Sequence, residues 1–266
     1  MRPSAASSVL YWCVEPRPMA SVRLVCFPYA GAGASAFRLW PTGLPETIEV
    51  LAAQLPGREG RFREPPARDW KSLVGEAVQG LQPNLGLPYA LFGHSMGAAL
   101  VLAITREIER RGVQQPRHLF VSGWPAPGRE ARWTRAARSL QDEDFLGELA
   151  RRYGSLNGTL LDEPEVRDVV LPTLRADIEV LEGSAQGPQG PVSCPLTVYG
   201  GTADPSTTPE DLQAWQDTTS GPFRIKLIPG GHFFLNDRRE ELLLDIGWTL
   251  ASRAAGRVAA AENASW

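Results

Sequence analysis

The sequence predicts one α/β domain in which helices cover both faces of a mostly parallel sheet. Three observations lead to this class. The chain has 266 residues, 43% of them hydrophobic, which suits one domain with a substantial core. Short apolar runs alternate along the chain with stretches of helical periodicity. One apolar run passes through a glycine-rich turn, residues 93–97, directly into a helical stretch.

The apolar runs are predicted to be buried strands because they are short and bounded by turn-forming residues. The first run stops at Pro28, and the second stops at Pro56-Gly57. In chain order, the predicted strands are 22–27, 48–55, 89–92, 118–121, 196–199 and 223–228.

Helices are predicted where apolar residues recur at helical spacing. One helical face consists of Trp70, Leu73, Val74, Ala77, Val78 and Leu81. A second helix is predicted at 97–111, where Gly112 provides the end signal. The closing helix is predicted at 240–254.

The predicted domain organisation follows from where this alternation holds. Residues 20–124 and 192–254 form the predicted α/β core. Residues 125–191 carry two helical patterns and no convincing strand, so we expect a helical lid inserted over the sheet; two ordinary covering helices are the alternative. We expect residues 1–19 to be a flexible leader and the Ala-rich residues 255–266 a flexible tail.

Composition excludes several classes of function. A formal net charge of -3 provides no global basic field for nucleic acid. No segment is long and apolar enough for a membrane span or a signal-peptide core, so we expect a cytoplasmic protein. Cys13, Cys26 and Cys194 lack metal-ligand spacing and are expected to be reduced. The scattered histidines form no ligand cluster, so we expect no metal. We also expect no cofactor.

The turn Gly93-His94-Ser95-Met96-Gly97 matches the pattern G-x-S-x-G. The pattern alone is weak, but here it lies between a predicted strand and a predicted helix, as the nucleophile elbow of α/β-hydrolases requires. The turn therefore predicts the α/β-hydrolase fold with Ser95 as nucleophile. A glycine-rich turn with a helix-capping serine is the alternative.

A serine hydroxyl needs an adjacent base, and the chain has three histidines. His232 follows the last predicted strand, where this fold places its base, so we predict His232 as the general base. His94 adjoins the serine in sequence, so its side chain should point elsewhere. His118 lies within a predicted strand and is expected to be a packed core residue.

The acid of the triad should lie between the serine and the histidine in sequence. Asp204 follows the predicted strand 196–199 and would lie at the carboxyl edge of the sheet, so we predict that it orients His232. Asp177, in the predicted lid, and Asp211, at the start of a helix, are the rivals.

Two backbone N–H groups should form an oxyanion hole. One is predicted at Met96, the residue after the nucleophile. The other should come from the loop after the first strong strand, and we predict Ala30, with Tyr29 as the alternative donor.

Five segments, taken together, are more specific than the serine motif alone. They are Leu24-Val25-Cys26-Phe27-Pro28-Tyr29-Ala30-Gly31, Gln54-Leu55-Pro56-Gly57-Arg58-Glu59, Phe92-Gly93-His94-Ser95-Met96-Gly97-Ala98, Leu174-Arg175-Ala176-Asp177 and Gly230-Gly231-His232-Phe233-Phe234-Leu235. In these segments the chain resembles the type II thioesterases of polyketide and nonribosomal-peptide pathways, and the resemblance extends over nearly the whole chain.

The resemblance implies an editing enzyme that hydrolyses acyl groups stalled on the phosphopantetheine arm of a carrier protein. The family's catalytic serine, histidine and aspartate fall on Ser95, His232 and Asp204. Acyl or peptidyl carrier proteins are the implied partners, and we expect a monomer. The family often has a tyrosine shortly after the segment that ends at Asp177, and this chain has none there, which leaves the acyl preference open.

Two further questions stay open at this level. A carboxylesterase or lipase would use the same triad on oxoesters, and a non-catalytic relative of the fold would be expected to lose Ser95 or His232. A set of arginines in the predicted lid could dock an acidic carrier or could form an ordinary solvated face. These arginines are Arg129, Arg132, Arg135, Arg138, Arg151 and Arg152.

Overall fold

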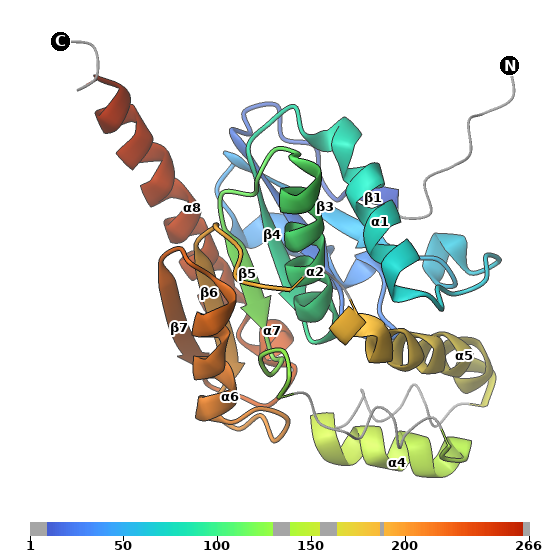
Figure 1. Cartoon of the computed structure of the whole chain (residues 1–266). Helices are drawn as coiled ribbons and strands as arrows, with labels where there is room; N and C mark the ends of the chain where they lie inside the picture. The colour runs from blue at the N-terminus through green and yellow to red at the C-terminus, as the bar shows by residue number, and fades with distance from the viewer. Residues whose placement is uncertain (1–9, 130–138, 155–163, 187–188, 263–266) are drawn as a thin grey trace, which may run out of the picture.

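The computed structural model describes residues 10–129, 139–154, 164–186 and 189–262 of the chain. In this part of the chain, strands form one sheet in the order β1-β3-β2-β4-β5-β6-β7 (Figure 1). The strands are β1 Leu10–Cys13, β2 Val22–Phe27, β3 Ile48–Gln54, β4 Tyr89–His94, β5 Leu119–Ser122, β6 Leu196–Gly201 and β7 Phe223–Ile228. The six predicted strands are confirmed, with ends shifted by no more than one or two residues.

Strands β2 to β7 pair in parallel, and β1 joins the edge strand β3 in the antiparallel direction. The carboxyl ends of parallel strands meet at one edge of a sheet. Ser95 follows β4, Asp204 follows β6 and His232 follows β7. The topology therefore collects the three predicted catalytic residues at the same edge.

Helices cover both faces of the sheet (Figure 1). The described helices are α1 Trp70–Leu81, α2 Met96–Arg111, α4 Asp142–Tyr153, α5 Pro164–Leu181, α6 Pro209–Gln213, α7 Phe234–Asp237 and α8 Arg239–Glu262. In β2, Val25 and Phe27 belong to the core cluster shared with α1 and α2, whereas Leu24 and Cys26 belong to the cluster under α8. Burial on both faces explains why β2 reads as a continuous apolar run.

Strand β1 lies within the segment predicted to be a flexible leader. The Tyr11 hydroxyl donates to a carbonyl oxygen of α1 at 2.8 Å, and the buried Arg17 guanidinium donates to the Leu44 carbonyl oxygen at 2.9 Å. The prediction of a flexible leader is wrong for residues 10–19, because a four-residue strand shows no periodicity and depends on the free edge of β3. Residues 1–9 lie outside the described part of the chain.

The predicted insertion enters the chain between β5 and β6. Its described residues include α4 and α5 and contain no strand, in agreement with the helical pattern. Pro172 lies inside α5, which continues on both sides of it. At the other end of the chain, α8 remains helical to Glu262, within the stretch predicted to be a flexible tail.

Candidate active site

Ser95 occupies a sharp turn between β4 and α2. Its backbone angles, φ 55° and ψ -118°, lie in a region that non-glycine residues rarely adopt. A Cβ at Gly93 would lie 2.0 Å from the Gly97 carbonyl oxygen, and a Cβ at Gly97 would lie 2.2 Å from that of Phe27. The Ser95 side chain makes no helix-capping hydrogen bond. This geometry is that of a nucleophile elbow rather than of a capping turn.

The structure brings His232 and Asp204 together from two separate loops. The His232 Nδ1 atom lies 2.9 Å from the Asp204 Oδ2 atom, and the two side chains are 1% and 0% exposed. The rival acids have other partners, since Asp211 belongs to the capping box of α6 and Asp177 pairs with Arg58.

Ser206 is a site residue that the sequence reading missed. Its backbone N–H and its hydroxyl donate to Asp204 Oδ1 at 2.9 and 2.6 Å, and the same hydroxyl lies 3.1 Å from His232 Nδ1. Burial by itself raises the pKa of Asp204, but hydrogen bonds and charge from His232, together with the Ser206 bonds, lower the pKa overall. Asp204 is therefore ionised at neutral pH, and its carboxylate faces the Nδ1 atom of His232 as a hydrogen-bond acceptor.

The other two histidines have buried structural partners. The His94 Nδ1 atom lies 2.9 Å from the Ser122 hydroxyl, and the His118 Nε2 atom lies 2.8 Å from the Thr197 hydroxyl. Burial, and then the electrostatic interaction with His232, lower the pKa of His94 well below its usual value. A neutral His94 ring thus packs 4.9 Å from the His232 ring, measured between centroids, without adding charge.

The second predicted oxyanion donor lies in a tight turn, residues 29–32, which we call the 29–32 turn. The Ala32 N–H donates to the Tyr29 carbonyl oxygen at 3.1 Å, and Gly31 has a φ of 78°, as the third position of a type II turn requires. The chain leading into this turn borders the Ser95 elbow, because Gly97 packs against the carbonyl of Phe27. Met96 begins α2, and the first N–H groups of a helix have no acceptor within it.

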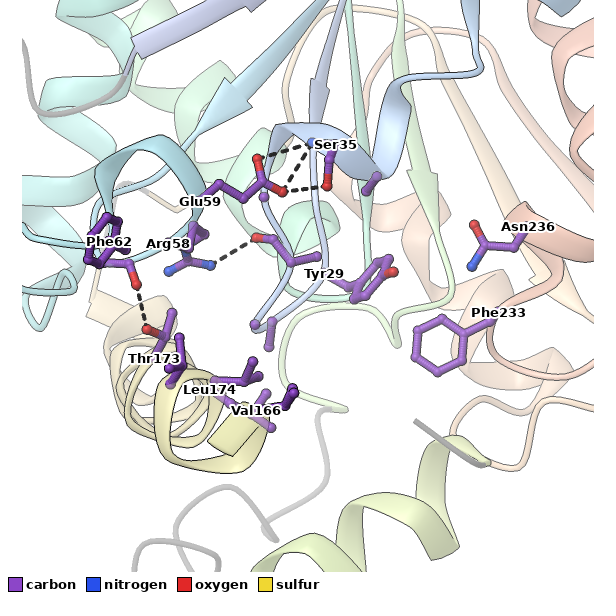
Figure 2. A pocket seen from close by; sticks show the side chains of 18 residues that line it. Tyr29, Ser35, Arg58, Glu59, Phe62, Val166, Thr173, Leu174, Phe233 and Asn236 are labelled. Carbon is purple, nitrogen blue, oxygen red and sulfur yellow. Dashed lines mark hydrogen bonds between the residues drawn. The ribbon is translucent and has the colours of Figure 1, made fainter. Parts of the chain in front are cut away.

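A pocket of about 360 Å³ opens beside the 29–32 turn (Figure 2). Its walls come from the turn, from the segment after β3 and from α5. In Figure 2, Tyr29 stands between Phe233 and Asn236 on one side and Val166 and Leu174 of α5 on the other. Phe233 lines this pocket, and its ring lies 5.1 Å from the His232 ring, measured between centroids, so the pocket adjoins the Asp204–His232 pair.

Both described helices of the insertion contact the site. The Tyr153 ring at the end of α4 packs 4.5 Å from the His232 ring, measured between centroids. Residues of α5 line the pocket. The insertion therefore lies over the sheet edge that carries Asp204 and His232, where the predicted lid would lie.

Part of the predicted arginine cluster is already engaged within the molecule. Arg151 and Arg152 pair with Glu148 at 2.7 and 2.6 Å, and Arg129 lies 3.8 Å from Asp211. The remaining members, Arg132, Arg135 and Arg138, lie outside the described residues. Carrier docking by this cluster stays a prediction.

Three other features of the described residues concern metal sites, membrane spans and cysteines. Among the described residues, no group of three or more His, Cys, Asp and Glu side chains has the arrangement of a metal site. Within the same residues, no helix combines the length and apolarity of a membrane span. Cys13, Cys26 and Cys194 are all free thiols, as predicted.

Comparisons with known proteins agree with this geometry. A family model described as a thioesterase domain matches residues 22–249. The gramicidin S biosynthesis protein GrsT of Aneurinibacillus migulanus is 39% identical over 242 residues, which cover 89% of this chain and 93% of that protein. The structure of RedJ, a thioesterase from the prodiginine pathway of Streptomyces coelicolor, matches with a TM-score of 0.80 and 40% identity, covering 92% of this chain and 96% of RedJ.

A further solved structure, the type II thioesterase BorB from the borrelidin biosynthetic cluster, matches with a TM-score of 0.80 and 32% identity, covering 92% of this chain and 98% of BorB. These matches extend nearly from end to end in both partners. The chain belongs to the thioesterase domain family: it has the α/β-hydrolase fold and is a hydrolase of thioesters.

Proposed function

We propose that this protein is a type II thioesterase that removes stalled or aberrant acyl groups from the phosphopantetheine arm of acyl or peptidyl carrier proteins. The observation that carries the proposal is the buried Asp204–His232 pair at the same sheet edge as the strained Ser95 turn. Relatives named for gramicidin S and prodiginine biosynthesis support this setting.

In the proposed reaction, the Ser95 hydroxyl oxygen attacks the thioester carbonyl carbon while His232 Nε2 takes the hydroxyl proton. The tetrahedral oxygen is stabilised by the N–H groups of Met96 and Ala30. The carbon–sulfur bond then breaks, and His232 returns the proton to the departing thiolate, which leaves as the free thiol of the carrier arm.

The second half of the reaction releases the acyl group from Ser95. A water molecule attacks the ester while His232 takes a proton from it, and the serine oxygen leaves with that proton. Asp204 holds the His232 ring in one tautomer and stabilises its charged form in both halves. No cofactor is needed, because every proton and electron pair is accounted for by the triad, the substrate and water.

The pocket beside the 29–32 turn is the proposed acyl site. Aliphatic side chains of α5, together with Phe233, provide an apolar wall suited to an acyl chain. In this proposal a carrier protein delivers the acyl chain to the pocket. We expect the enzyme to act as a monomer in the cytoplasm, without nucleic acid or membrane partners.

The test compares an acyl-loaded carrier protein with p-nitrophenyl esters of the same acyl chain. We expect much higher kcat/KM on the carrier-bound thioester, and a fall of about four or more orders of magnitude in Ser95→Ala. Ser72→Ala, an exposed serine on α1, is the matched control and should retain full activity. A preference for the oxoesters would instead indicate a carboxylesterase.

A further inference from the structure

Asp177 is a buried carboxylate that the proposed chemistry does not use. It belongs to α5 and is 1% exposed. Arg58 donates to both of its oxygens, from Nη1 to Oδ2 at 2.6 Å and from Nη2 to Oδ1 at 2.7 Å. The Gly31 N–H donates to Oδ2 at 2.7 Å. One carboxylate thus joins α5, the segment after β3 and the 29–32 turn.

Arg58 holds the same turn from a second direction. Its side chain is 4% exposed, and Nη1 also donates to the Ala32 carbonyl oxygen at 3.1 Å (Figure 2). The pair therefore binds one N–H and one C=O of the 29–32 turn. Bidentate arginine–carboxylate pairs fix geometry more tightly than single hydrogen bonds do.

The surroundings leave the 29–32 turn little freedom. A Cβ at Gly31 would lie 3.3 Å from Leu174 Cδ1, so α5 packs directly against the turn. The Thr173 hydroxyl donates to the Gly57 carbonyl oxygen at 2.7 Å, which ties α5 to the segment that carries Arg58. Ala30 occupies the second position of the turn, so the direction of its N–H depends on how the turn is held.

We infer that Asp177, together with Arg58, is a positioning residue that sets the Ala30 N–H for the tetrahedral oxygen of the reaction. The inference rests on the proposed function, which assigns this N–H to the oxyanion hole. Because Asp177 belongs to α5, the wall of the acyl pocket and the oxyanion donor are held by the same carboxylate. The mutual neutralisation of Arg58 and Asp177 adds no net charge beside the developing oxyanion.

The choice of variants follows from the burial of the pair. Removing one partner leaves a buried charge uncompensated, which destabilises the fold whatever the role of the pair. The double variant Arg58→Met/Asp177→Leu removes both charges and, with them, the acceptor for the Gly31 N–H. The double variant Arg58→Gln/Asp177→Asn also removes both charges but retains an amide oxygen that can accept from Gly31.

The matched control is another ion pair between α5 and a distant segment, and it does not bind the turn. Arg68 Nη1 lies 2.7 Å from Glu179 Oε2, and Arg68 is 65% exposed. Arg68→Gln/Glu179→Gln should leave catalysis unchanged. Thermal melting of all three double variants establishes that each is folded before kinetics are compared.

Kinetics on a short free thioester are measured beside the affinities of two inhibitors. A trifluoromethyl ketone adds to serine and places an oxyanion in the hole, whereas a thioether of the same length mimics only the ground state. For Arg58→Met/Asp177→Leu we expect kcat to fall by about 10- to 100-fold with KM within about twofold, and the ketone Ki to rise by the same factor. Thioether binding should be unchanged, and Arg58→Gln/Asp177→Asn should recover at least half of the loss on a logarithmic scale.

Several results would overturn the inference. One is a rise in KM with kcat unchanged, and another is equal weakening of the ketone and the thioether. A third is the same loss in both double variants of the pair, which would mean that the acceptor for Gly31 is irrelevant. Failure of the proposed function would look different, because the wild-type enzyme would then prefer the p-nitrophenyl esters to the carrier-bound thioester, whatever the double variants do.

Discussion

Replacing Asp204 by asparagine should leave the triad in place but give His232 the wrong tautomer. Two donors, the Ser206 N–H and hydroxyl, point at Asp204 Oδ1 at 2.9 and 2.6 Å. In Asp204→Asn these donors retain the amide oxygen at that position. The amide NH₂ then faces His232 Nδ1, 2.9 Å away, and donates to it.

The magnitude follows from this reversed hydrogen bond. With Nδ1 acting as acceptor, the neutral ring carries its proton on Nε2 and cannot take a proton from Ser95. We expect kcat to fall by about 10³- to 10⁴-fold, equivalent to about 4–5.5 kcal/mol in the activation barrier. The side chain is isosteric and its Oδ1 bonds are retained, so the fold should be kept.

The assay is thiol release from a short free thioester, together with ¹⁵N NMR of the histidine ring nitrogens to identify the tautomer. Asp211→Asn is the control, because Asp211 belongs to the capping box of the exposed helix α6 and should affect stability by about 1 kcal/mol at most. The reasoning is refuted if Asp204→Asn retains more than about a tenth of wild-type kcat, or if its His232 still carries the proton on Nδ1.

Other perturbations test the elbow, the buried Glu107 carboxylate of α2 and the lid. In Gly97→Ala the new Cβ would lie 2.2 Å from the Phe27 carbonyl oxygen, so urea unfolding should show a loss of about 1–3 kcal/mol or more and activity should drop; unchanged stability would contradict the close approach. Hydrogen bonds from two neighbouring arginines lower the pKa of Glu107 to about 2, so Glu107 stabilises the fold at neutral pH and this contribution is lost as pH falls from about 4.5 towards 2. At pH 7 we expect Glu107→Gln to have a free energy of unfolding about 1–2 kcal/mol lower than wild type, after allowance for solvent screening. Urea unfolding measured at a series of pH values should show this difference disappear as the pH falls towards about 2. Tyr153→Ala removes the ring that covers His232, so hydrogen exchange of α4 should accelerate while that of β4 stays slow, and equal protection of both elements in wild type would count against a lid.

The sequence by itself determined the features that depend on local chemistry. The turn glycines Gly93 and Gly97 could be recognised in the sequence because only glycine fits at these positions. A Cβ there would lie 2.0 and 2.2 Å, respectively, from a carbonyl oxygen. Strands β2 to β6 could be predicted because burial on both faces leaves a nearly continuous apolar run. The edge strand β7 is less buried and contains Arg224 and Lys226 between its apolar residues. Asp204 and His232 could be selected because each follows a strand whose carboxyl end meets the catalytic edge of a parallel sheet.

Only the tertiary structure decided the features that depend on a distant partner. Strand β1 exists because β3 offers it an edge, and nothing in its four residues displays that edge. Ser206 is an ordinary turn serine until the fold brings His232 beside it, 26 positions away in the chain. Asp177 resembled a rival catalytic acid in the sequence, and its partner Arg58 lies 119 positions away. Hydrogen bonds across such separations depend on how whole helices and strands pack together. A sequence pattern can therefore identify these residues but cannot predict which distant residues they bond to.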